Sequence, residues 1–294
     1  IDDALRHHAR GAPAAPCASF EGRHWCWGEF EALVDAAAQA LAAAGVAAGD
    51  RIAMLSTPRP EYLLILMATS RLGAVYVGLN PRYTPAELAR ALARVRPRLI
   101  VTLREFEGQD FQALLAAASI APMPPVLPFA CMDSCMQALL TLAGPLPSVP
   151  GGPDAQTGAA LGHTAAIVFT SGTTGQPKAA MLTHRGLLLA AAVQHLRLNT
   201  APARYLCNLP INHVGCLMNL TLAALVGGGS IVFQQRFSAA HTLQLIHDEG
   251  VNCWLQVPAM FHACVQDPGF DPRALSHLQS ICIGHNALNN WHSQ

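Results

Sequence analysis

The sequence contains little charge. Of its 294 residues only 12% are Asp, Glu, Lys or Arg, and 18 basic side chains balance 18 acidic ones. The formal net charge is therefore zero, so the chain has no excess of positive charge with which to bind a nucleic acid. Lys178 is the only lysine, and the other residues among the 18 basic ones are arginine. By contrast, 52% of the residues are hydrophobic, which is enough for a large folded core.

Long apolar runs and paired cysteines are also missing. No apolar run reaches the roughly 18 residues that a membrane span requires, and the nearest candidate, residues 62–69, is soon followed by Arg71. The first residues do not resemble a signal peptide, so we expect a cytoplasmic protein whose nine cysteines are reduced thiols. Cys131 and Cys135 have no second pair at zinc-ligand spacing, and we therefore assign no metal ligands.

Short apolar runs alternate with helical patterns along most of the chain, which predicts an α/β fold. The sequence Thr84-Pro-Ala-Glu87 has the form of a capping box and predicts the start of a helix. Pro and Gly are frequent at 145–162, so we predict a first α/β subdomain at 1–150, a linker at 151–162 and a second α/β subdomain at 163–294. The predicted strands are 51–55, 74–78, 99–102, 167–170, 205–209, 230–233, 252–256 and 280–283. The predicted helices include 30–41, 60–72, 186–196, 215–226, 239–249 and 258–266.

One stretch, IVFTSGTTGQPKAAMLTH at 167–184, gathers small hydroxyl residues and glycines beside the only lysine. Glycines let backbone N–H groups turn toward one point, hydroxyls add donors that rotate to fit, and a lysine adds a compact positive charge. Together these groups suit a polyphosphate. An ordinary surface turn is the alternative for the bare loop, but the complete stretch with Pro177-Lys178 is far more specific.

The stretch is not the phosphate loop of ordinary nucleoside triphosphatases. That loop requires Gly directly before the lysine and Ser or Thr directly after it. Here Pro177 precedes Lys178 and Ala179 follows it. A kinase or GTPase function is therefore excluded by the residues themselves.

The stretch 167–184 closely resembles the phosphate-binding signature of the adenylate-forming (AMP-binding) superfamily. This superfamily includes acyl-CoA synthetases, aryl-CoA ligases, luciferases and the adenylation domains of peptide synthetases. Weaker similarities in the expected order are Gly49-Asp-Arg51, LNPRYTPAEL at 79–88, LPINHVG at 209–215 and GHNAL at 284–288. The resemblance implies two doubly wound, mostly parallel βαβ subdomains of the family's N-terminal domain, truncated before the family's barrel and C-terminal domain.

The resemblance implies that ATP activates a fatty or aryl carboxylic acid to an acyl-adenylate, which then passes to coenzyme A. The acid needs no general base, because its pKa of about 4–5 leaves it ionised at pH 7. The site must instead offset charge, since two unit anions about 4 Å apart repel by roughly 4 kcal/mol at an effective dielectric of about 20. Donors from the loop, Lys178 and a Mg²⁺ ion would supply that charge compensation.

The resemblance assigns roles residue by residue. Lys178 and Thr174 take the catalytic role, His213 and Gly215 belong to the acyl pocket, and His184 is structural. The nucleotide-binding residues are Thr170, Ser171, Gly172, Thr173, Thr174, Gly175, Lys178 and Gly284. The expected small molecules are ATP, Mg²⁺, coenzyme A and a carboxylate substrate.

This sequence also departs from the family pattern. Ala179 stands where the family usually has Gly, and His285 and Asn286 interrupt the segment that lines the adenine and acyl pocket. The family's later motifs are absent, including a Tyr-Gly-x-Thr-Glu segment, a ribose-binding Asp and a second catalytic lysine. We therefore expect the front portion of an acyl-CoA synthetase. The alternatives are a peptide-synthetase adenylation domain and a catalytically incomplete nucleotide-binding remnant.

Overall fold

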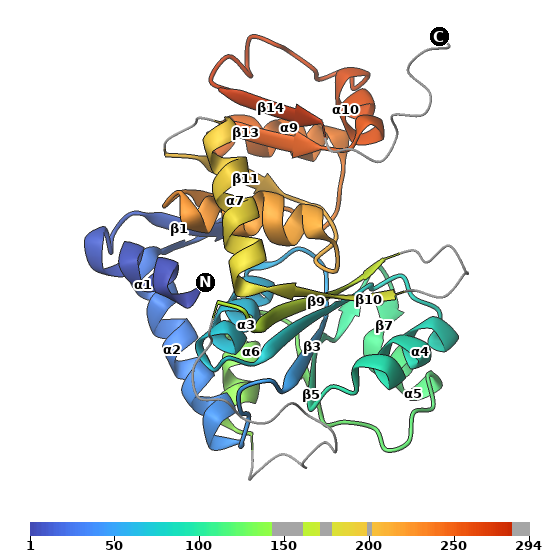
Figure 1. Ribbon diagram of the computed structural model, residues 1–294. Helices are drawn as coiled ribbons and strands as arrows, with labels where there is room; N and C mark the ends of the chain where they lie inside the picture. Colours follow the sequence, from blue (N-terminus) through green and yellow to red (C-terminus); the bar gives the residue numbers. More distant parts are fainter. Residues whose placement is uncertain (143–160, 171–177, 199–201, 284–294) are drawn as a thin grey trace.

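The computed structural model describes residues 1–142, 161–170, 178–198 and 202–283, and its strands form two large sheets (Figure 1). Within these residues each large sheet has six strands, and a hairpin of β6 (Glu105–Phe106) and β7 (Gln109–Asp110) stands apart. The first sheet has the order β10 (Lys178–Thr183), β9 (Thr164–Thr170), β4 (Val75–Leu79), β3 (Arg51–Leu55), β5 (Leu99–Leu103) and β8 (Val126–Phe129). The second sheet has the order β14 (Ser280–Ile283), β13 (Cys253–Gln256), β11 (Arg204–Cys207), β12 (Ser230–Phe233), β1 (Pro16–Phe20) and β2 (Arg23–Cys26).

Both sheets are mainly parallel, as the predicted α/β fold requires. Only β10 in the first sheet and β2 in the second run antiparallel to their neighbours. The carboxyl ends of the parallel strands therefore meet at one edge of each sheet, which is where ligands bind in open α/β folds. The helices that connect or cover the strands are α1 (Asp2–Gly11), α2 (Trp27–Ala43), α3 (Pro60–Arg71), α4 (Pro85–Val95), α5 (Phe111–Ala117), α6 (Met132–Leu140), α7 (His184–Leu198), η1 (Gly215–Leu222, a π-helix), α8 (Ala223–Val226), α9 (Ala239–Asp248) and α10 (Pro258–Val265).

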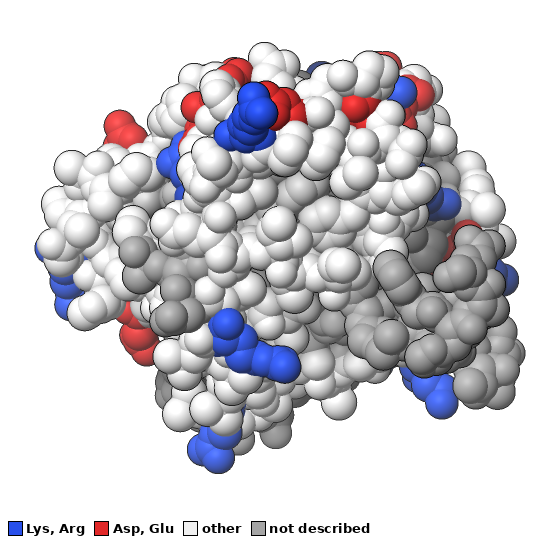
Figure 2. All heavy atoms as spheres, turned by 90° about the horizontal axis from the view of Figure 1, so that it is seen from above, with Lys and Arg blue, Asp and Glu red and all other residues white. Residues whose placement is uncertain are grey.

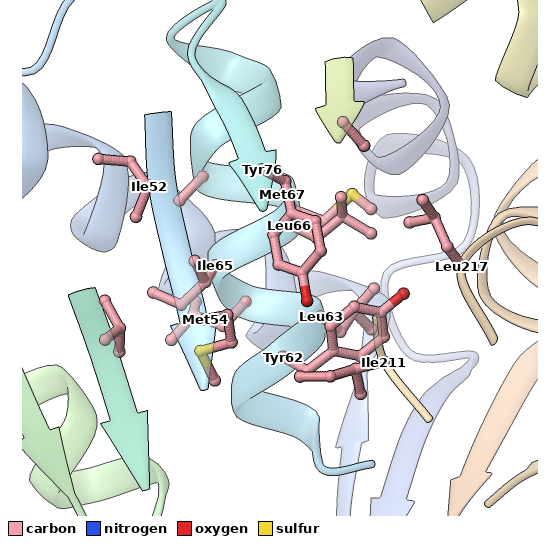
Figure 3. Packing of buried hydrophobic residues seen from close by; sticks show 14 of the residues in the cluster. Ile52, Met54, Tyr62, Leu63, Ile65, Leu66, Met67, Tyr76, Ile211 and Leu217 are labelled. Carbon is pink, nitrogen blue, oxygen red and sulfur yellow. The ribbon is translucent and has the colours of Figure 1, made fainter. Parts of the chain in front are cut away.

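Helix α3 joins the two sheets into one core. It contacts β3 and β4 of the first sheet and β1 of the second, so it is buried on nearly every side. A helix that is apolar all round is typical of such a central position. Figure 3 shows side chains from α3 packed against Tyr76 of β4 and against Ile211 and Leu217, which come from the second half of the chain. A smaller cluster lies on the other face of the second sheet, where Trp254 packs against α10.

The division into subdomains at 151–162 stays a prediction, but sheet membership does not follow that boundary. Strands β1 and β2 come from the first part of the chain and pair beside β12 in the second sheet. Strands β9 and β10 come from the second part and pair beside β4 in the first sheet. Each sheet therefore contains strands from both parts of the chain.

Helices and strands that were not predicted complete the fold. These are α1, β1, β2, β6, β7, α5, β8, α6 and β10. Most are short or lie at a sheet edge, where the burial that produces a clear hydrophobic period is incomplete. One view of the surface, Figure 2, shows a mostly uncharged face, with basic and acidic side chains side by side near its upper rim and further charged side chains elsewhere.

Candidate functional site

The hydroxyl–glycine stretch joins two paired strand ends. Thr170 is the last residue of β9 and Lys178 is the first residue of β10, and the two are cross-strand partners in an antiparallel pair. The Thr170 hydroxyl donates to the Lys178 carbonyl oxygen at 3.5 Å. Both residues are exposed, whereas the five residues before Thr170 in β9 are buried. The buried strand thus fixes a solvent-accessible cation and hydroxyl at the carboxyl edge of the first sheet.

Strand β10 corrects the sequence prediction. No strand was expected after the loop, but Lys178–Thr183 pairs with β9 along its whole length. Lys178 therefore sits on a sheet edge rather than in a free loop. The assigned residues Ser171, Gly172, Thr173, Thr174, Gly175 and Gly284 lie outside the described residues, so their roles stay predictions.

The 209–215 segment leaves the carboxyl end of β11 and leads into η1. The exposed His213 ring accepts a hydrogen bond at Nδ1 from the Gly215 backbone N–H at 3.0 Å. With Nδ1 acting as acceptor, the neutral ring carries its proton on Nε2. His213 can therefore present an N–H donor to an oxygen of a ligand.

Gly215 makes this ring position possible. A Cβ atom added at Gly215 would lie 3.2 Å from His213 Nδ1 and 3.4 Å from a methyl carbon of Leu209. A larger residue would have to push the imidazole or Leu209 away. The structure therefore brings His213 and Gly215 together, as the resemblance implied for the acyl pocket.

Strand β4 of the first sheet lies directly against this segment. A Cβ atom at Gly78 of β4 would approach both Asn212 Cα and the Ile211 carbonyl oxygen to 2.7 Å. The backbone of the 209–215 segment thus rests on β4, which pairs with β9, the strand that ends at Thr170. Sequence reasoning missed Gly78, because nothing in the pattern of a buried strand distinguishes a glycine required by a close approach.

Two further predictions concern histidine and metal. His184, the first residue of α7, is buried, and burial lowers its pKa to about 4. Its Nε2 has no hydrogen-bond partner among the described residues, and its structural role stays a prediction. Across the residues that the structure describes, no three His, Cys, Asp or Glu side chains lie close enough together to hold a metal ion.

A family model described as AMP-binding enzyme matches residues 5–291. The chain belongs to the AMP-binding enzyme family. Its similar curated relatives include an indoleacetate–CoA ligase of Aromatoleum aromaticum, 31% identical over 97% of this chain and 54% of the relative. A feruloyl-CoA synthase of an Amycolatopsis species is 30% identical over 94% of this chain and 52% of that enzyme. The chain therefore spans about half the length of these relatives.

Solved structures give this AMP-binding family member the same fold. A putative long-chain-fatty-acid CoA ligase from Rhodopseudomonas palustris matches with a TM-score of 0.79 at 22% identity, over 95% of this chain and 68% of that one. An o-succinylbenzoate CoA synthetase from Bacillus subtilis, solved with an acyl-adenylate, gives a TM-score of 0.77 at 23% identity, over 97% and 68% of the two chains. These matches confirm the predicted α/β architecture of the family's N-terminal domain.

Proposed function

We propose that this chain carries the phosphate- and acid-binding part of an enzyme that activates a carboxylic acid with ATP and then forms an acyl-CoA. The observation that supports the proposal is that the two candidate groups are carried on neighbouring strands of the first sheet. The β9–β10 strand ends present Lys178 and Thr170, and the 209–215 segment, resting on the neighbouring β4, presents His213.

In the proposed reaction a carboxylate oxygen attacks the α-phosphorus of ATP and pyrophosphate leaves with the bond electrons. The exposed ammonium of Lys178 would reduce the charge repulsion between the attacking carboxylate and the phosphates. His213 would donate from Nε2 to an oxygen of the acid and hold it in line. Neither residue has to remove a proton, because the acid is already ionised.

The proposed substrate is an aryl or fatty acid. The residues around His213 are largely apolar, since Leu209 and Ile211 are buried and η1 is built mainly from apolar side chains. The relatives named above are an indoleacetate–CoA ligase and a feruloyl-CoA synthase, and a further one, 30% identical, is a 4-coumarate–CoA ligase of Humulus lupulus. All three names specify aromatic acids, which favours the aryl over the fatty class.

Mg²⁺, coenzyme A and a cytoplasmic location complete the proposal. The described residues offer no cluster of ligands for the ion, so we derive no step through it. None of the described helices has the length and apolar character of a membrane span. The predicted lack of nucleic-acid binding rests on the zero net charge.

The test is acid-dependent exchange of pyrophosphate into ATP, measured with a panel of aryl, fatty and amino acids. We expect exchange with aryl or fatty acids, in the chain extended to the length of its relatives if the 294 residues prove insufficient. Exchange with amino acids alone would favour the peptide-synthetase alternative. If neither the 294-residue chain nor the extended chain exchanges pyrophosphate with any acid, the proposal is contradicted. The alternative of a catalytically incomplete nucleotide-binding remnant would then be favoured.

Lys178→Ala should lower the exchange rate by about 100-fold, the scale seen when one charge-stabilising donor is removed from an active site. Arg94→Ala is the matched control, because it removes an exposed cation from the last turn of α4. Equal exchange rates in the Lys178→Ala variant and the wild type would refute the role of Lys178.

A further inference from the structure

Two buried thiols face each other beside the 209–215 segment. Cys207 is the last residue of β11 and Cys216 is the second residue of η1. Their sulfur atoms lie 3.4 Å apart, and both side chains are fully buried. The chain between them consists of residues 208–215, which include His213 and Gly215. The two cysteines therefore lie side by side at the two ends of the connection that carries the proposed acid-binding residues.

The surroundings of the pair are apolar apart from a few hydroxyl groups. The Tyr62 hydroxyl donates to Thr221 Oγ1 at 3.2 Å, and the Tyr62 and Tyr76 rings meet edge to face at 5.6 Å. Figure 3 shows both tyrosines in the core between the sheets, with Leu217 of η1 nearby. The hydrogen bond to Cys216, together with burial, raises the pKa of the Cys207 thiol well above its ordinary value.

These conditions keep the pair reduced while the segment is closed. An oxidant reacts with a thiolate that it can reach, and neither requirement is met inside this core. Both sulfurs would become accessible together if residues 208–215 and the start of η1 moved away from β11. Oxidation of the pair would then require the opening of the proposed acid pocket.

We propose that Cys207 and Cys216 form a reversible disulfide that holds the 208–215 segment closed in the presence of a peroxide. One thiolate attacks the peroxide, forming a sulfenic acid and one molecule of water when hydrogen peroxide is the oxidant. The second thiolate then attacks that sulfur and displaces the oxygen as a second water. The two cysteines together lose two protons and two electrons, and hydrogen peroxide is reduced to two waters. Once one sulfur is oxidised and the segment has closed again, the sulfurs have only to approach from 3.4 Å to the roughly 2.05 Å of a disulfide.

A substrate in the pocket should slow this reaction, a consequence that rests on the proposed function. A bound acid that contacts His213 would favour the closed segment and so protect the sulfurs. The disulfide would in turn restrain the residues that must move to admit or release the acid. Formation of the disulfide and its effect on the proposed activity can therefore be measured in separate experiments.

The chemical test treats the native protein with hydrogen peroxide and maps disulfides by peptide mass spectrometry. A Cys131→Ser background removes an exposed thiol whose pKa is lowered by hydrogen bonds from Ser134, the thiol most prone to react elsewhere. We expect a linked peptide joining Cys207 to Cys216 that disappears after dithiothreitol, while the buried Cys264 stays a thiol. Free thiols at Cys207 and Cys216 after prolonged treatment, or preferential pairing of either with another cysteine, would overturn the proposal.

The functional test compares pyrophosphate exchange before oxidation, after oxidation and after reduction. Exchange should fall several-fold on oxidation, recover with dithiothreitol, and remain unaffected in a Cys216→Ala variant that melts at a similar temperature. A mapped disulfide without any change in exchange would overturn the control of the pocket. If no acid supports exchange at all, the proposed function fails, whereas the mapped disulfide still tests the pair.

Discussion

At the scale of single residues, His213 is the group whose contacts specify its role most closely. Its Nδ1 is occupied by the Gly215 N–H, so only Nε2–H is available to a ligand. His213→Ala should raise the KM for the acid in pyrophosphate exchange by about tenfold and leave the KM for ATP unchanged, since a hydrogen bond to a charged group contributes roughly 1.5–3 kcal/mol. His262→Ala, on the exposed side of α10, is the control. An equal rise in both KM values would place His213 outside the acid pocket.

Gly78 is the residue where the close approach of β4 and the 209–215 segment can be tested. Gly78→Ala would place a Cβ atom 2.7 Å from backbone atoms of Ile211 and Asn212, which cannot rotate away. We expect a loss of about 2 kcal/mol in the free energy of unfolding, and a melting temperature lower by several degrees. Gly11→Ala, where no atom lies within 4 Å of the added Cβ, should leave the melting temperature unchanged or slightly raised. Equal melting temperatures for both variants would refute the contact.

His184 should make the folded state sensitive to acid. Its pKa is about 4 in the folded chain because burial disfavours the charged ring, against an ordinary value of 6.5. The unfolded chain therefore binds this proton first, and the stability contributed by the neutral ring is complete above pH 6.5 and lost as the pH falls toward 4. Urea unfolding of wild type and His184→Gln between pH 7 and 4 should show a shallower decline in the variant. Parallel curves would contradict the assignment.

At the scale of elements, the capping box of α4 shows what the sequence could predict. The Thr84 side chain accepts from the Glu87 N–H, and the Glu87 carboxylate accepts from the Thr84 N–H at 2.8 Å, as the pattern requires. Thr84→Ala should cost about 1 kcal/mol of stability, measured by urea unfolding, whereas Thr84→Ser should cost much less. The hydrogen bond to the Thr84 N–H lowers the pKa of Glu87, so part of the effect should vanish as acid protonates that carboxylate. A similar loss in both variants would mean that the hydroxyl does not act as the cap.

Several strands were predictable from short apolar runs, and two of them are buried on both faces. Arg51–Leu55, Ser230–Phe233 and Ser280–Ile283 have the predicted bounds, and the first two are buried at every residue. The hairpin of β1 and β2 was missed because its turn, Glu21-Gly22, lacks the Asn-Gly or Asp-Gly signal that its two positive φ angles usually require. Strand β10 was missed because an edge strand that alternates weakly between half-buried and exposed residues has no hydrophobic period.

The candidate site was predictable in its residues but not in its assembly. The signature identified Thr170 and Lys178, and the resemblance identified His213 with Gly215. The sequence contains no signal that the 209–215 segment rests on Gly78 of β4, because such a contact depends on tertiary packing. The sequence also does not indicate that the Cys207 and Cys216 side chains, at the two ends of residues 208–215, lie in contact.

At the scale of the whole molecule, apolar side chains remain exposed on helix α7. Leu189, Val193 and Leu196 are 61%, 54% and 74% exposed and follow one another at helical spacing along a single face. Ile281 and Ile283 of the edge strand β14 are also more than half exposed. Because apolar patches of this kind promote association, the isolated chain should self-associate at micromolar concentration in light scattering after gel filtration. Leu189→Glu with Leu196→Glu should reduce it, and a monodisperse wild-type monomer would contradict the prediction.

In the proposed function the β9–β10 strand ends hold the phosphates of ATP. The most direct measurement is the binding of ATP and of AMP to wild type, Lys178→Ala and Arg94→Ala by titration calorimetry at low salt. We expect Lys178→Ala to weaken ATP binding at least tenfold and AMP binding much less, while Arg94→Ala binds both as the wild type does. Equal ATP affinity in the wild type and in Lys178→Ala, or no ATP binding by the wild type, would contradict it.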